Sequence, residues 1–158
     1  MPYNLRIPTQ RTYYFHIDES EDLVNLVEVD KNEPHDFHFT FRQASAADNE
    51  QRTQVLSRRE WRPDGEGKML LFDETNKDTV NRTEIYLTLV DTDLNFPDGT
   101  ALEFETKNGI TKLKSRQQFD LFWKAMYPPH WAEVISACCL RTNPAWDPKR
   151  QDAARVGD

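Results

Sequence analysis

The chain has 158 residues and a formal net charge of −7, with 37% hydrophobic and 30% charged residues. This acidic balance argues against a general surface for nucleic acid or anionic membranes. No apolar run approaches the ~20 residues of a membrane-spanning helix, and the first ten residues lack the apolar core of a secretory signal. We therefore expect a cytoplasmic protein with one domain over 1–147 and a polar, disordered tail over 148–158.

The front of the chain predicts a small antiparallel sheet that follows an extended arm over residues 1–11. Residues with high β-propensity are concentrated in three runs, which we interpret as strands over 12–17, 23–30 and 36–42. In the last run phenylalanines alternate with polar residues, which predicts that Phe37, Phe39 and Phe41 face the core. The opposite, solvent-facing side is expected to carry Asp36, His38, Thr40 and Arg42.

The middle of the chain predicts two helices. Ser45 is a good N-cap, and the helix that it starts should run to about Trp61, before the turn residues at 63–67. Its apolar content is thin, so we interpret it as a surface helix. Residues 79–90 fit a strand or a helix by periodicity, and Asp78 as an N-cap favours the helix.

A turn and a β-hairpin are predicted next. In the turn over 95–100, Pro97 presets its own φ and Gly99 permits a positive one. Two short apolar runs, 102–106 and 110–113, then flank an Asn-Gly pair, which is a strong signal for a hairpin.

Residues 115–146 contain three of the four tryptophans and predict two helices in an αα-hairpin. Ser115 and Gln118 have the spacing of a capping box, in which the glutamine reaches back to the serine. Pro128 and Pro129 end the first helix and favour the start of a second. The apolar face of the second helix is expected to carry Trp131, Val134, Ile135 and Cys138. Asn143 is expected to close it in a left-handed conformation.

Candidate partner-binding residues come from three stretches. Trp123 and Trp131 suit either a core or a groove for a partner, and we favour the core. Trp61 lies among arginines, but the nearby acids and the net charge argue against nucleic acid there. The acidic run at 18–22 is either a solvated face or a contact for a basic partner. The resulting candidates are Glu19, Glu21, Asp22, Trp61, Trp123 and Trp131.

The sequence contains no recognised nucleophile, phosphate-binding or metalloprotease motif. Histidines on the strands suggest a metal site in principle, although their spacing fits no recognised zinc arrangement; they are His16, His35 and His38. His130 lies roughly two helical turns from Cys138, which is too far for it to activate that thiol. Cys138 and Cys139 diverge on a helix, so we interpret both as free thiols. We expect no catalytic residue, metal or cofactor.

The stretch FTFRQASAADNEQR at 39–52 places a phenylalanine-rich strand before a helix start. In TEIYLTLVDTDLNFPDGTALEF at 83–104, a helix precedes an Asp-Gly turn and an apolar strand. With the terminal helices that end in NPAW at 143–146, this order resembles that of siphophage and prophage tail assembly chaperones. The resemblance implies a non-enzymatic cytoplasmic factor that coats the tape-measure protein and recruits tail-tube subunits. The acidic front and the strands at 12–30 depart from that pattern.

We therefore predict an α+β fold, in which a small N-terminal antiparallel sheet precedes a mostly helical C-terminal half that ends in a helical hairpin. The predicted function is a phage or prophage tail assembly factor with a protein partner, such as the tape-measure or tail-tube protein, and no nucleic-acid or membrane partner. Homo-oligomers are left open. A structural virion component, such as a neck or tail protein, is the alternative, and a small metal-dependent enzyme is a third hypothesis.

Overall fold

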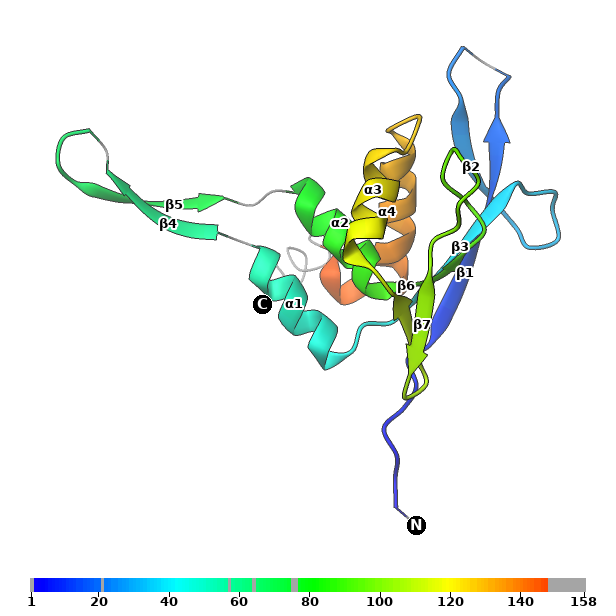
Figure 1. Cartoon of the computed structure of the whole chain (residues 1–158), viewed down its shortest axis with the longest axis horizontal. Helices are drawn as coiled ribbons and strands as arrows, with labels where there is room; N and C mark the ends of the chain where they lie inside the picture. Colours follow the sequence, from blue (N-terminus) through cyan, green and yellow to red (C-terminus); the bar gives the residue numbers. More distant parts are fainter. Residues whose placement is uncertain (1, 21, 57, 64, 75–76, 148–158) are drawn as a thin grey trace, which may run out of the picture.

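The computed structural model describes residues 2–20, 22–56, 58–63, 65–74 and 77–147 and has an α+β fold (Figure 1). An antiparallel sheet has the order β2-β1-β3-β6, and its strands are β1 Gln10–Asp18, β2 Asn25–Val29, β3 Phe37–Arg42 and β6 Leu89–Thr92. The helices are α1 Ala46–Leu56, α2 Lys77–Thr88, α3 Arg116–Lys124, α4 Trp131–Thr142 and the short 3-10 helix η1 Pro144–Trp146. Two hairpins are formed by β4 Arg58–Pro63 with β5 Met69–Glu74 and by β7 Phe104–Lys107 with β8 Ile110–Leu113.

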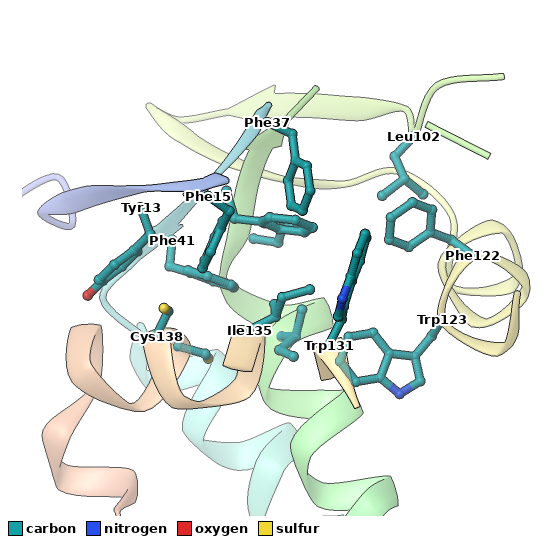
Figure 2. Packing of buried hydrophobic residues seen from close by; sticks show 14 of the residues in the cluster. Tyr13, Phe15, Phe37, Phe41, Leu102, Phe122, Trp123, Trp131, Ile135 and Cys138 are labelled. Carbon is teal, nitrogen blue, oxygen red and sulfur yellow. The ribbon is translucent and has the colours of Figure 1, made fainter. Parts of the chain in front are cut away.

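The helical hairpin packs on the aromatic face of the sheet (Figure 2). The predicted alternation in β3 is confirmed, because Phe37, Phe39 and Phe41 are all buried. The ring of Phe37 lies 5.7 Å from that of Trp131 at the start of α4. At the other end of α4, the hydroxyl of Tyr13 lies 2.9 Å from that of Thr142. Large aromatic side chains of β1, β3 and α4 therefore meet in the core, to which α2 and α3 add Ile85, Phe119 and Phe122.

The solvent-facing side predicted for β3 is wrong at two residues. Thr40 is 7% exposed and Arg42 is 2% exposed. The guanidinium of Arg42 donates to the backbone carbonyls of Thr111 in β8 and Leu87 in α2, at 3.0 and 2.6 Å. Elements from later in the chain thus cover the end of β3, which the alternation of a single strand cannot predict.

Helix α1 is attached to the body mainly through charged side chains. Its buried residues are Asp48 and Arg52. Nη1 of Arg42 lies 2.6 Å from the carboxylate of Asp48, and Nε of Arg52 lies 2.6 Å from that of Glu84 in α2. Both ion pairs are buried, so the cost of removing each charged group from water must be offset by its partner and by further hydrogen bonds. The prediction of a surface helix missed this attachment.

The burial of Glu84 predicts a specific dependence of stability on pH. Burial raises the pKa of Glu84 above its ordinary value of 4.5, although Arg52 acts in the opposite direction. A raised folded-state pKa means that the contribution of Glu84 to stability is complete below the unfolded pKa and is lost as the pH rises through the folded pKa. We expect the unfolding free energy of the wild type to fall as the pH rises, relative to that of Glu84→Gln, which carries no titrating group at this position. Urea denaturation from about pH 4 to about pH 7 measures this, and a difference that grows with pH contradicts it.

The predicted helix from Ser45 to about Trp61 is too long. Helix α1 ends at Leu56, and the chain then enters β4, which pairs with β5. Gly65 and Gly67 in the connecting turn both have a φ of +86°, a conformation that glycine adopts without strain. The hairpin that this turn permits projects away from the rest of the molecule (Figure 1). It was not predicted.

The elements predicted between residues 79 and 113 are confirmed in outline. Residues 79–88 lie in α2, while the last two residues of the predicted helix belong to β6. The turn over 95–100 is closed by a hydrogen bond of 2.8 Å from the amide of Phe96 to the carbonyl of Thr100. The β7–β8 hairpin turns through Asn108 and Gly109, whose φ values are 53° and 77°. Two successive positive φ values are what a tight hairpin turn needs, which is why this pair was predictive.

Both helices of the predicted αα-hairpin are present, and two details of their caps differ. Ser115 accepts from the amide of Gln118 at 3.1 Å, as predicted. The side chain of Gln118, however, accepts from the amide of Glu103 rather than reaching back to Ser115. Asn143 has a φ of −122°, so the left-handed closure is wrong. Its amide group instead bonds the backbone of Ala44 and Arg42, and thereby ties the end of α4 to the end of β3 and the loop that follows it.

Candidate partner-binding surface

A small apolar hollow lies where the loop at 94–97 meets the end of α3 and the start of α4. Its volume is about 150 Å³. The hollow is lined mostly by apolar side chains, from Leu94, Phe96, Pro97, Phe122, Ala125, Met126, Tyr127 and Trp131. An apolar hollow of this size accommodates one large side chain of a partner, which is how anchor residues bind in protein interfaces. We call it the hairpin hollow.

Both walls of the hairpin hollow are formed by elements that local sequence patterns predict. In the turn, Asp98 accepts from the amide of Thr100, and this hydrogen bonding lowers the pKa of the aspartate. The turn holds the ring of Phe96 in an edge-to-face contact with that of Phe122 in α3, with 5.5 Å between ring centroids. On the other wall α3 ends before the double proline, and Tyr127 stands 81% exposed at this point. An exposed tyrosine beside an apolar hollow is a typical feature of a binding surface.

The chain just after the acidic run at 18–22 contacts Trp131, one of the residues that line the hairpin hollow. The indole nitrogen of Trp131 donates to the carbonyl of Val24, just after this run, at 3.2 Å. Glu19 and Asp22 are exposed, whereas Glu21 lies outside the described residues. Asp18 accepts hydrogen bonds from Ser20, which lower the pKa of its carboxyl. Two of the predicted acidic candidates are therefore brought to the same end of the molecule as Trp131.

The two candidate tryptophans of the helical hairpin lie in the core, and each also lines a hollow at the surface. Trp123 is 8% exposed and Trp131 is 7% exposed, so most of each indole is packed against other side chains (Figure 2). Trp131 lines the hairpin hollow. Trp123 lines a more open groove of about 470 Å³ between α2 and α4, with Asp78 and Glu133 among its other residues. The burial supports the core interpretation that we favoured for both.

Trp61 is separated from the other candidates. Its backbone lies in β4, opposite Leu71 of β5. The position of its side chain lies outside what the structure describes. Trp61 therefore belongs to the projecting hairpin and not to the helix in which it was predicted.

Of the histidines that suggested a metal site, His16 and His38 are engaged with separate carboxylates. His16 lies 3.1 Å from Asp36, while His38 lies 2.8 Å from Asp91 and 3.3 Å from Asp93. The ring of His35 packs on Tyr14, with 4.7 Å between centroids. Within the described residues, no group of three or more histidine, cysteine, aspartate or glutamate side chains is placed to hold a metal ion.

The two thiols are buried. Cys138 and Cys139 are free, and each is 1% exposed. Burial raises the pKa of both thiols to about 12, so both are protonated at neutral pH. The Sγ of Cys139 lies 3.3 Å from the hydroxyl of Thr88, a neutral partner. Protonated, buried thiols are core side chains and not nucleophiles.

Comparison with known proteins gives no relative: no family model, curated protein or solved structure matches the chain. Among the helices in the described ranges, none has both the length and the apolar content to cross a membrane.

Proposed function

We propose that this protein is a non-enzymatic assembly factor of a phage or prophage tail, which acts in the host cytoplasm by holding a protein partner. The observation that carries the proposal is the hairpin hollow, an apolar site for one large side chain. Its lining residue Trp131 donates to the carbonyl of Val24, two residues after the exposed acid Asp22. A partner segment with an apolar anchor and a nearby lysine or arginine complements both features. The resemblance to tail assembly chaperones suggests the tape-measure protein as that partner.

Replacing Tyr127 with alanine is expected to weaken this partner binding by about tenfold, or ~1.4 kcal/mol. The side chain is 81% exposed, so its removal should leave the fold intact. The measurement is the affinity of the purified chain for the tape-measure protein of the same phage or prophage, after co-expression shows that the two co-purify.

Leu121→Ala is the matched control, because Leu121 lies on α3, is 58% exposed, and is not among the residues that line the hairpin hollow. The proposal fails if the two proteins do not associate, or if both variants weaken the association equally.

A structural role in the virion is a second candidate, favoured by the two extensions of the molecule. The β4–β5 hairpin projects from one side, and the N-terminal arm leaves the sheet at its lower end (Figure 1). Such extensions are suited to permanent contacts between neighbouring subunits. Mass spectrometry of purified virions separates the two candidates, because an assembly factor is absent from the finished particle and a structural component is present.

A further inference from the structure

The N-terminal arm over residues 2–9 has the residue pattern of an unpaired strand. Its apolar side chains alternate and are exposed: Tyr3 is 101% exposed and Leu5 is 99% exposed, while Ile7 is 67% exposed and lies beside Gly109 of the β7–β8 turn. Pro2 and Pro8 bracket these residues, and prolines are tolerated at the ends of edge strands. Such a segment gains its missing backbone hydrogen bonds and buries its apolar face by adding to an existing sheet.

Strand β2 offers a matching acceptor. It lies at one edge of the sheet and spans five residues, Asn25–Val29, the same length as the segment 3–7 between the prolines. Two more of the exposed large apolar side chains lie at this edge, since Leu23 is 64% exposed and Val27 is 41% exposed. An edge strand with exposed apolar residues is a template for strand addition.

The arm cannot reach β2 of its own chain. Val29, the end of β2 nearest the arm, is paired with Tyr14, which is four residues or ~13 Å along β1 from Gln10. A strand added outside β2 lies about 10 Å to the side of β1, so the nearest added position is ~16 Å from Gln10. The three residues from Ile7 to Gln10 span at most ~11 Å. The segment therefore has to be accepted by another molecule.

Charge favours a second copy of this chain as that molecule. The arm contains Arg6 and no carboxylate, within a chain whose net charge is −7. The β1–β2 turn beside the acceptor strand carries the acids Asp18, Glu19 and Asp22. Arm and turn lie at opposite ends of β1, so they meet only between copies (Figure 1).

We propose that residues 3–7 of one copy add as a strand to the free edge of β2 in a second copy, with Arg6 close to the acidic turn. The arm and the edge of β2 are different surfaces. Two copies that exchange arms with each other form a closed dimer, whereas copies that each donate an arm to the next form a ring or a filament. This self-association goes beyond the proposed function and holds whether or not the hairpin hollow binds a tail protein.

Light scattering coupled to gel filtration tests the self-association on the full chain without any partner. The wild type should form dimers or larger oligomers, and the double variant Leu5→Asp/Ile7→Asp should raise the dissociation constant at least about tenfold. Leu121→Asp makes the same chemical change at another exposed leucine, on α3, and should leave the association unchanged. A monomeric wild type at high micromolar concentration overturns the proposal, as does an arm variant that associates like the wild type.

Disulfide trapping between two differently marked chains tests the register. A chain with Leu5→Cys, mixed with a chain with Val27→Cys, should form a cross-linked heterodimer under mild oxidation. The native thiols give no background, because Cys138 and Cys139 are buried and free. Leu121→Cys in place of Val27→Cys is the control, and equal cross-linking in the two mixtures overturns the assignment of β2 as the acceptor.

Discussion

Replacing Arg42 with alanine is expected to lower the free energy of unfolding by about 3–5 kcal/mol, a large part of the stability of a domain this size. The substitution leaves the carboxylate of Asp48 buried without its cation. It also removes donors to the carbonyls of Leu87 and Thr111, so the contacts between β3, α2 and β8 are lost together. Urea denaturation followed by tryptophan fluorescence measures the change.

Two further variants show whether the loss of stability comes from the buried carboxylate of Asp48, which Arg42→Ala leaves without a cation. Arg42→Met combined with Asp48→Leu removes both charges and should recover the part of the loss that comes from the unpaired carboxylate, because a buried ion pair can be replaced by apolar side chains of similar size. Lys112→Ala removes an exposed cation of β8 and should change stability by no more than ~0.5 kcal/mol. An Arg42→Ala variant as stable as Lys112→Ala would contradict the buried network.

The parts of the fold that were predictable are those that local chemistry determines. The alternating phenylalanines of β3 could be assigned to the core, since the period of two is visible within six residues. The β7–β8 turn was predictable because Asn108 and Gly109 tolerate a positive φ. The start of α3 was predictable from Ser115, whose hydroxyl accepts from an amide three residues later. Each of these signals involves residues close together in the chain.

The parts that could not be predicted depend on partners far along the chain. Arg42 was assigned to solvent because its partners lie in α1, α2 and β8. Arg52 pairs with Glu84, 32 residues later, and nothing in either local pattern marks them as a pair. Ser45 was interpreted only as the start of a helix, although Asp48, which accepts from its amide, also pairs with Arg42. Buried polar side chains in this fold connect elements that are far apart in the sequence, and the periodicity of hydrophobic residues does not reveal such contacts.

The candidate surface was predictable only in pieces. The turn over 95–100 and the two helices were each expected from local signals, but their meeting at Phe96 and Phe122 was not. The acidic run was singled out for its charge, while its link to Trp131 through Val24 joins residues 107 positions apart. A hollow lined by separate segments exists only in the folded chain, which is why the sequence indicated its residues without its shape.

Replacing Trp131 with alanine is expected to cost about 3–5 kcal/mol of unfolding free energy, as for other large aromatic side chains in cores. The indole is 7% exposed, packs on Phe37 and donates to the carbonyl of Val24. Its loss therefore leaves a cavity between α4 and the sheet and an unpaired carbonyl near the acidic run. Chemical denaturation measures the cost, with Trp131→Phe as an intermediate variant that keeps an aromatic ring and loses the indole donor.

This substitution also separates the two interpretations of the tryptophan. If Trp131 acts mainly as core, Trp131→Ala lowers stability by several kcal/mol, while Tyr127→Ala at the rim of the same hollow changes stability by no more than ~0.5 kcal/mol. If Trp131 were chiefly a contact for the partner, its replacement would reduce partner binding and leave the denaturation midpoint unchanged. Because Trp131 is nine-tenths buried and Tyr127 is mostly exposed, we expect the first outcome, with the core tryptophan supporting a surface on which the tyrosine makes the contact.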